Sequence, residues 1–236
     1  VFNDAGASLT VASSTFFGNT ATGASVAPSR TIEAPSVVAA FGGGAIANGA
    51  GATTTVSGST FLDNQATNSA GGAISSLGGT VTVQSPASTF SRNTADTTGG
   101  AISVAAGSLS VSTATFGGND ASNDGGAVAV AAGVTATVAQ SGFTGNFSGA
   151  SGGAISTGTS LGLTSDTFTL NEAEVNGGAL FVAGGTTTLD TTRVFLNRAV
   201  TGTGGGIFKA AGTVTFVNNS QVTLNSPDNC NFSCPA

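Results

Sequence analysis

The chain has 236 residues, of which 37 are glycine and only 7% are charged, and it lacks histidine, tryptophan, tyrosine and methionine. A net charge of −6 with five basic residues excludes a basic patch for nucleic acid, and no run of about 20 apolar residues is present to cross a membrane as a helix. The glycine-rich, charge-poor composition also argues against a helix-rich protein or a charged disordered tail, and the missing methionine indicates a processed chain or an excerpt.

The first predicted element is an incomplete coil that ends in the motif Phe16-x-x-Asn19. The next copy of the motif, which ends at Asn64, follows after more than one repeat length, and we assign the excess to a loop inserted at residues 20–41. Because the loop ends in an apolar run, Val37–Phe41, we expect it to pack against the coils or against a neighbouring subunit.

Two motifs then alternate along the chain with a period of about 27 residues, as expected for a repeat protein. A Gly-Gly-Ala-Ile-type motif begins at residues 43, 71, 99, 125, 152, 177 and 204. A Phe-x-x-Asn motif alternates with the glycine motif. Its aromatic residue is Phe16, Phe61, Phe90, Phe116, Phe143 or Phe168, and the last two copies have Val194 and Val222 instead. Its asparagine is at Asn19, Asn64, Asn93, Asn119, Asn146, Asn171, Asn197 and Asn225.

Within each repeat the apolar residues recur with period two in short runs between Gly, Ser and Asn, which indicates strands. A unit of this size cannot bury its own core, so neighbouring units must stack. The sequence therefore predicts an all-β, right-handed parallel β-helix at residues 1–226, with about eight coils of three strands each, followed by a tail at 227–236.

The repeated residues receive structural roles in this fold. We expect each Phe to point inward and stack on the Phe of the next coil, and each Asn to use its amide between coils at a corner. The paired glycines serve a second corner, where a Cβ would clash. The Ala of the glycine motif is expected to face outward and form a smooth strip, from Ala45 and Ala73 to Ala179 and Gly206.

The two motifs, repeated in the same order, resemble the repeats of the bacterial polymorphic outer membrane proteins. Members of that family are autotransported adhesins whose passenger is a parallel β-helix. The resemblance covers about residues 6–225. It implies surface exposure and adhesion, and it carries over no catalytic residues.

Candidate sites for chemistry are sparse. Parallel β-helices include polysaccharide lyases, but here the acids are scattered and no catalytic residue or cofactor is predicted. Asp120 and Asp124 lie between glycine pairs and are weak candidates for a Ca²⁺ site. Cys230 and Cys234 in the tail predict a disulfide, which indicates an oxidising environment.

The outward face of the middle strand carries two columns of Ser and Thr, which include Thr53, Thr55, Thr80, Thr82, Thr135 and Thr137. Three interpretations are open: Thr favours strands, the columns bear O-linked glycan or a lateral contact, or they bind ice as β-solenoid antifreeze proteins do. Among the N-glycosylation sequons, those at Asn218 and Asn231 are candidates for modification, whereas the ladder residue Asn146 is expected to be buried.

Neither end of the repeat region shows an evident cap in the sequence, and open coil ends favour head-to-tail stacking. We therefore predict an extracellular or cell-surface, non-catalytic structural subunit of a fibre or surface layer, without a membrane span or nucleic-acid partner. We expect it to self-assemble through the ends of the β-helix and the inserted loop and to carry glycan. The alternatives are an adhesin passenger segment that binds glycans or a host receptor, an ice-binding solenoid and a polysaccharide lyase.

Overall fold

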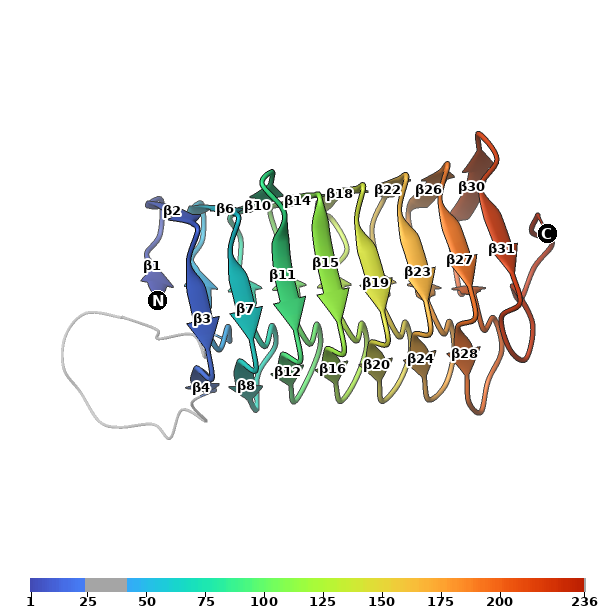
Figure 1. The fold of residues 1–236 in the computed structure, drawn as a ribbon, viewed down its shortest axis with the longest axis horizontal. Coiled ribbons are helices and arrows are strands. Elements are labelled where there is room, and N and C mark those ends of the chain that lie inside the picture. Colours follow the sequence, from blue (N-terminus) through green and yellow to red (C-terminus); the bar gives the residue numbers. More distant parts are fainter. Residues whose placement is uncertain (24–41, 236) are drawn as a thin grey trace.

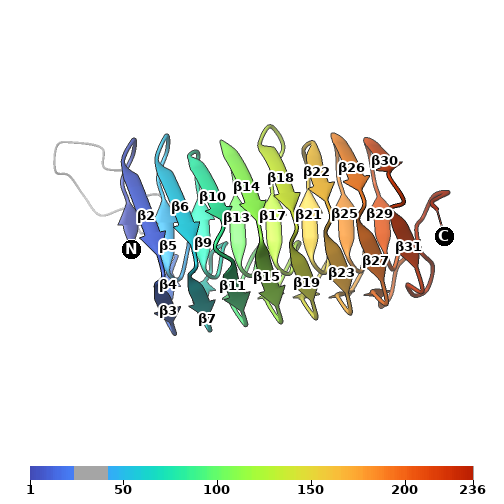
Figure 2. The same cartoon turned by 45° about the horizontal axis from the view of Figure 1, so that its top comes forward.

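The computed structural model describes residues 1–23 and 42–235, and these residues form a rod built from parallel strands (Figure 1). Three sheets have eight strands each and a fourth has seven, so the chain makes about seven full turns. Figure 2 shows the strands of neighbouring turns in rows along the rod axis. The described part contains no helix. The predicted parallel β-helix is confirmed.

The strands of sheet 1 are β1 (Phe2–Asn3), β5 (Ile46–Asn48), β9 (Ile74–Ser76), β13 (Ile102–Val104), β17 (Val128–Val130), β21 (Ile155–Thr157), β25 (Leu180–Val182) and β29 (Ile207–Lys209). Those of sheet 2 are β2 (Ser8–Ala12), β6 (Thr53–Ser57), β10 (Thr80–Gln84), β14 (Ser108–Ser112), β18 (Thr135–Ala139), β22 (Leu161–Thr164), β26 (Thr186–Asp190) and β30 (Thr213–Val217). Those of sheet 3 are β3 (Thr15–Phe17), β7 (Thr60–Leu62), β11 (Ser88–Ser91), β15 (Ala114–Gly117), β19 (Gly142–Thr144), β23 (Thr167–Thr169), β27 (Arg193–Phe195) and β31 (Gln221–Thr223). Those of sheet 4 are β4 (Thr20–Thr22), β8 (Gln65–Thr67), β12 (Thr94–Ala95), β16 (Asp120–Ala121), β20 (Phe147–Ser148), β24 (Glu172–Ala173) and β28 (Arg198–Ala199).

Sheet 4 corrects the expectation of three strands per coil. Its strands have two or three residues and follow directly after the ladder asparagine, as Thr94–Ala95 follows Asn93. A strand of this length has a single inward residue, such as the buried Ala95, and it therefore leaves no period-two pattern in the sequence.

The first strand of sheet 4 also corrects the N-terminal bound of the predicted insertion. Residues Thr20–Thr22 form β4 and pair in parallel with β8, so they belong to the repeat and not to a loop. The remainder of the predicted loop, from residue 24 to residue 41, lies outside the described residues.

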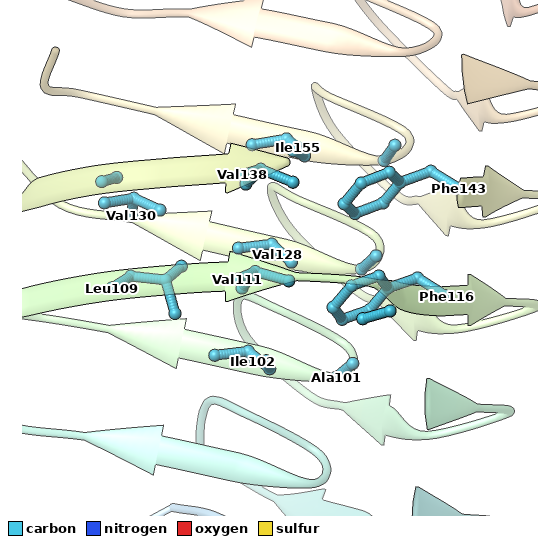
Figure 3. Close-up of a cluster of buried hydrophobic side chains, with 14 of the residues drawn as sticks. Ala101, Ile102, Leu109, Val111, Phe116, Val128, Val130, Val138, Phe143 and Ile155 are labelled. Atoms are coloured by element: carbon cyan, nitrogen blue, oxygen red, sulfur yellow. The ribbon is translucent and has the colours of Figure 1, made fainter. Parts of the chain in front are cut away.

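The core fills the interior along the whole rod and contains the residues that alternate inward from each strand (Figure 3). In β14, Leu109 and Val111 are buried, whereas Ser110 between them is exposed. The Ala of each glycine motif also belongs to this core: Ala101, for example, has no exposed surface. The expected outward alanine strip is therefore wrong, because the residue after the glycine corner turns inward before the strand begins.

The glycine corner has a steric cause that Gly99 and Gly100 illustrate. Gly99 has a φ of +67°, in the left-handed region that side chains rarely adopt. A Cβ on Gly100 would lie 2.2 Å from the carbonyl oxygen of Gly126 in the next turn. One glycine is required for its backbone angle and the other for the close approach of adjacent turns.

Candidate binding surface

A stack of phenylalanine rings supports sheet 3 from inside. The rings of Phe16, Phe61, Phe90, Phe116, Phe143 and Phe168 form a continuous column with centroids 4.6–4.9 Å apart and nearly parallel planes. Val194 and Val222 continue the column in the last two turns, where they are fully buried. The ring spacing matches the spacing that backbone hydrogen bonds give to neighbouring strands.

The asparagines form a hydrogen-bonded ladder at the corner between sheets 3 and 4. In a typical step, the backbone N–H and Nδ2 of Asn93 both donate to Oδ1 of Asn119, at 3.1 and 3.0 Å. Nδ2 of Asn93 also donates to the carbonyl oxygen of Phe61 in the preceding turn, at 3.0 Å. The same pattern connects Asn19, Asn64, Asn93, Asn119, Asn146, Asn171, Asn197 and Asn225.

A second polar ladder, not predicted from the sequence, lies two residues before the phenylalanine column. The Ser59 backbone N–H donates to Oγ of Ser88, and that of Ser141 donates to Oδ1 of Asp166. The signal in the sequence was the recurring Ser-x-Phe triplet, in which the first residue can accept a hydrogen bond from the preceding turn. The ladder positions are Ser14, Ser59, Ser88, Ala114, Ser141, Asp166, Thr192 and Ser220.

Asp166 is the one acid of this ladder, and its side chain is almost completely buried. Its carboxylate accepts hydrogen bonds from the backbone N–H groups of Ser141 and Thr164, at 2.8 and 2.9 Å. Burial raises its pKa to about 7 because desolvation of the charged form outweighs the two hydrogen bonds, which favour ionisation. The group therefore titrates near neutral pH.

The outward hydroxyl columns of sheet 2 hold their register from one turn to the next. Thr80 pairs with Thr53 and Ser108, and Thr82 with Thr55 and Ser110. Further along, Ser108 pairs with Thr135 and Ser110 with Thr137. Gly162 of β22 interrupts one column, and Thr188 and Thr215 resume it. The result is a band of hydroxyl groups spaced about 4.8 Å apart along the rod.

The outward face of sheet 1 is hollowed and forms a furrow. The middle residues of its strands share one column, in the order Ala47, Ser75, Ser103, Ala129, Ser156, Phe181 and Phe208. Although they face outward, the first four are at most 9% exposed. One part of the furrow is a hollow with a volume of about 330 Å³, whose lining includes Ala70, Thr98, Asp124, Ala105, Ala131 and the floor residues Ser103, Ala129 and Ser156.

The three serine side chains of the furrow floor, Ser75, Ser103 and Ser156, make no hydrogen bond within the described part of the chain. Ser75 and Ser103 are 5% and 8% exposed. Ser76, which points to the interior, accepts a hydrogen bond from Nδ2 of Asn48 at 3.1 Å. The furrow was not identified from the sequence, because its walls are turns whose positions depend on the stacking.

Charged groups are distributed along the rod. Arg92 forms a two-pronged ion pair with Asp63, and Arg198 pairs with Glu172 at 3.1 Å, in each case across adjacent turns. Hydrogen bonding to Arg92 lowers the pKa of Asp63. These pairs lie at the surface and contribute little to stability.

The two weak candidates for a Ca²⁺ site occupy different parts of the turn. Asp120 begins β16, where partial burial raises its pKa, whereas Asp124 lies at the furrow wall and accepts a hydrogen bond from the Ser151 N–H at 2.9 Å. Within residues 1–23 and 42–235, no three acidic or cysteine side chains gather as a metal site would require.

The sequons differ in their accessibility. Asn146 is fully buried and its Nδ2 donates to both Phe116 and Asn171, so it has no free amide for a glycan. Asn218 is exposed, and its Nδ2 donates to Asp190 at 2.9 Å. Asn231 is also exposed, and its amide binds the backbone N–H and carbonyl of Lys209.

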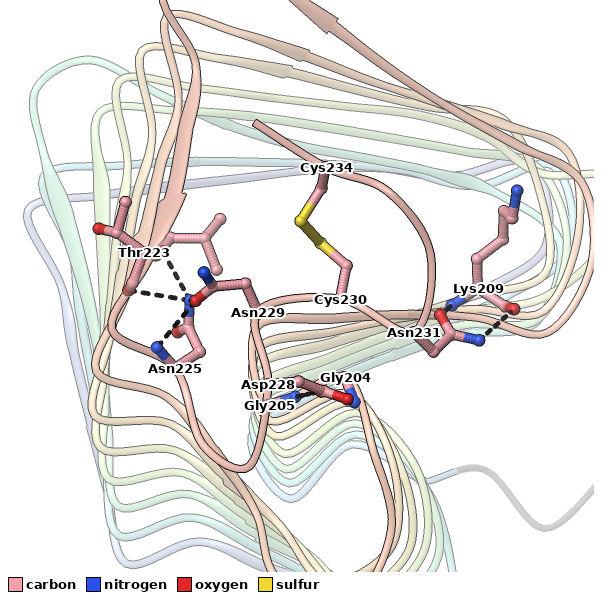
Figure 4. The surroundings of a disulfide bond; sticks show 11 residues. Gly204, Gly205, Lys209, Thr223, Asn225, Asp228, Asn229, Cys230, Asn231 and Cys234 are labelled. Carbon is pink, nitrogen blue, oxygen red and sulfur yellow. Dashed lines mark hydrogen bonds between the residues drawn. A yellow bond between two sulfur atoms is a disulfide. The ribbon is translucent and has the colours of Figure 1, made fainter. Parts of the chain in front are cut away.

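The C-terminal segment, residues 226–235, folds across the last turn (Figure 4). Cys230 and Cys234 form a disulfide, and both pack against the core together with Phe232. The Phe232 ring stacks on Phe216 at 6.3 Å, and the Lys209 ammonium lies 4.8 Å from its centre. The expectation of an uncapped C-terminal coil is therefore wrong, because a segment without helix or repeat motif forms the cap.

The segment supplies the hydrogen-bond partners that a further turn would supply. Oδ1 of Asn229 accepts from the backbone N–H and Nδ2 of Asn225, at 3.0 and 3.2 Å, and so extends the asparagine ladder. The Asp228 carboxylate accepts from the N–H groups of Gly204 and Gly205. The Asn229 carbonyl oxygen also accepts from Gly206, which replaces the usual Ala because a Cβ there would lie 2.6 Å from that oxygen.

The comparisons with known proteins agree with this architecture. The family model of the Chlamydia polymorphic membrane protein repeat matches residues 87–105, a stretch that contains Phe90, Asn93 and the glycine motif at Gly99. The chain thus carries repeats of this type within a parallel β-helix. No curated protein and no solved structure matches the chain. In the described residues, no helix has the length and hydropathy of a membrane span.

Proposed function

We propose that the protein is a surface-displayed or secreted, passenger-like β-helix that acts as a non-catalytic adhesive rod. The observation that carries the proposal is the register of the outward columns: the hydroxyl band of sheet 2 runs unbroken from β2 to β18 and resumes in β26 and β30 after Gly162. Such a surface offers the same chemistry at many points and suits multivalent contact. The polymorphic membrane protein repeat supports a location at the cell surface.

The distribution of titratable groups supports adhesion over catalysis. A catalytic site requires unlike groups that converge at one place. In the described chain the acids are spread over the rod, and the arginines of two turns are paired with acids of the adjacent turns. Within the described residues, the donors to the carboxylate of the buried acid Asp166 are the backbone N–H groups of Ser141 and Thr164.

The C-terminal segment opposes end-to-end contact between two copies of the rod. Stacking on that end would require displacement of residues 226–235, which already satisfy the last turn. We therefore assign intermolecular contacts, including any assembly into a fibre, to the lateral faces of the rod. Ice binding and polysaccharide cleavage remain the competing hypotheses.

The adhesion test uses beads coated with the purified chain and counts the cultured cells that they retain. The double variant Thr82→Lys/Thr137→Lys changes the outward face of sheet 2, and Thr89→Lys/Thr144→Lys makes the same change on the outward face of sheet 3. We expect the unmodified chain to retain cells and the sheet 2 variant to retain several-fold fewer than the sheet 3 variant. Failure of the unmodified chain to adhere would refute the adhesive role.

The glycan component of the proposal has a separate test. We propose that Thr residues of the hydroxyl band, or Asn218 and Asn231, carry glycan in the native material. The intact mass of protein from its source should then exceed the chain mass of 22.3 kDa by a heterogeneous amount. A mass equal to that of the chain would remove the glycan from the proposal and leave adhesion to the protein surface.

A further inference from the structure

The furrow of sheet 1 is shaped for an extended ligand that lies along the rod. Its floor column from Ala47 to Ser156 spans five strands, or roughly 20 Å at the spacing of parallel strands. The floor residues are Ala and Ser and repeat once per turn, and beside Ser103, Ala129 and Ser156 turns on both sides form the walls of the hollow. A narrow channel with a periodic floor suits a single linear chain with repeating units.

The chemistry of the floor points to a ligand rich in hydroxyl groups. Ser75 and Ser103 are more than nine-tenths buried and have no partner in the described structure, and Ser103 lines the hollow itself. A serine hydroxyl can donate one hydrogen bond and accept two. Sugar hydroxyl groups both donate and accept, so they can form hydrogen bonds with these side chains in the turns that carry serine.

Two phenylalanines stand in the same column beyond the small residues. Phe181 follows Ser156 in register, and Phe208 follows Phe181, with ring centroids 5.7 Å apart. Both rings are partly exposed. The negative face of an aromatic ring attracts polarised C–H groups, which pyranose rings present on their flat faces. The pair thus offers a stacking platform at one end of the furrow.

Charge further narrows the ligand class. Asp124 is the charged residue in the described lining of the hollow, and the chain as a whole has a net charge of −6. An anionic polysaccharide would be repelled by both. An extended peptide usually gains affinity by pairing with a free strand edge, but strands β5 to β25 of sheet 1 have partners on both sides.

We propose that the furrow over sheet 1 binds a neutral linear glycan, with Ser75 and Ser103 as hydrogen-bonding groups and Phe181 and Phe208 as a stacking platform. This inference rests on the proposed adhesive function, to which it adds a second contact surface with a stated ligand class. The ligand would lie parallel to the rod axis and contact one floor residue per turn.

The experiment measures binding of the full chain to immobilised hexasaccharides of β-1,4-glucan, β-1,3-glucan and α-mannan, with a heparin hexasaccharide as the anionic comparison. Ser103→Leu fills the furrow floor, and Thr115→Leu, on the outward face of sheet 3 in the same turn, is the matched control. We expect binding to at least one neutral glycan, a loss of tenfold or more in Ser103→Leu, and unchanged affinity in Thr115→Leu. Phe181→Ala should reduce the affinity several-fold.

Several outcomes would overturn the inference. They are binding to heparin alone, absence of binding to every neutral hexasaccharide, equal affinity of Ser103→Leu and the unmodified chain, or competition by an extended peptide but not by glycan. Circular dichroism of both leucine variants establishes that the fold is retained. If the chain retains cells in the bead assay but Ser103→Leu binds the neutral hexasaccharides as tightly as the unmodified chain, the furrow inference fails while the adhesive function stands.

Discussion

The repeat body and the C-terminal segment both supply hydrogen-bond acceptors to the edge of the preceding turn, but they do so with different residues. In the body, each turn satisfies its neighbour with the same groups, as the Gly177 and Gly178 N–H groups donate to the backbone carbonyls of Thr203 and Gly204. At the last turn, the carboxylate of Asp228 takes over the role of those carbonyls. The hydrogen bonds of the body use the same groups in every turn, whereas the segment uses the side chains of two different residues at a single place.

This difference teaches what a cap for a β-helix needs. The edge of the last turn requires acceptors at defined positions, but the acceptors need not come from a strand. Asn229 replaces both a ladder side chain and a corner carbonyl, and the disulfide-linked residues cover the end of the apolar core. A short irregular segment can therefore end a column of identical turns.

The asparagine ladder should be the part of the body most sensitive to mutation. Asn119→Ala removes the acceptor for the N–H and Nδ2 of Asn93 and the donor to the Phe90 carbonyl, all in a fully buried site. We expect a loss of about 3–5 kcal/mol in the free energy of unfolding, measured by chemical denaturation. The control is Asn19→Ala, at the half-buried first position, with a loss of about 1 kcal/mol. Equal losses would show that the ladder is not a cooperative feature of the body.

Asp166 departs from the Ser and Thr that occupy most positions of its ladder, and Asp166→Ser would restore the pattern. The pKa of Asp166 is about 7 in the folded protein, above its ordinary value of 3.8. Between these two pH values the folded protein therefore holds a proton that the unfolded chain has released. The stability of the unmodified chain should thus fall as pH rises from about 4 to 7. We expect the variant to gain on the order of a few kcal/mol at pH 8 and little at pH 4. Denaturation curves at both pH values test this, and a pH-independent difference would contradict it.

Two buried threonines at equivalent inward positions of sheet 2 should respond in opposite ways to the same substitution. Oγ1 of Thr187 is buried without a hydrogen-bond partner, whereas that of Thr54 donates to Asn48 at 2.8 Å and accepts from Asn3. We expect Thr187→Val to stabilise the protein by about 1 kcal/mol and Thr54→Val to destabilise it by about 1–3 kcal/mol. Thermal melts of the two variants, run side by side, measure the difference. A destabilised Thr187→Val would mean that its hydroxyl has a partner.

The cap should show a smaller and more local effect than the body. Asn229→Ala removes the acceptor for the Asn225 N–H and Nδ2 at a half-buried site. We expect the protection of the Asn225 amide from hydrogen exchange to fall by about 1 kcal/mol, with no change at Asn119. Loss of protection along the entire rod would indicate instead that the cap controls global stability.

The sequence by itself determined the repeat, the parallel β-helix and the residues of the phenylalanine and asparagine columns. These features were predictable because each turn has the same environment, so every position acquires a consistent residue type that recurs with the period of about 27 residues. The hydroxyl band was visible for the same reason. The Ser ladder was equally available, since Ser-x-Phe recurs, although Ala114 and Asp166 interrupt the pattern.

Other features were decided only by the tertiary structure. The short strands of sheet 4 leave no pattern of their own, and the inward turn of Ala101 depends on the path of the chain through the glycine corner. The furrow arises where turns from adjacent coils form walls beside outward residues such as Ser103. The cap occurs once and thus has no period to reveal it, because Asp228 and Asn229 acquire their roles only when the segment folds back onto the last turn.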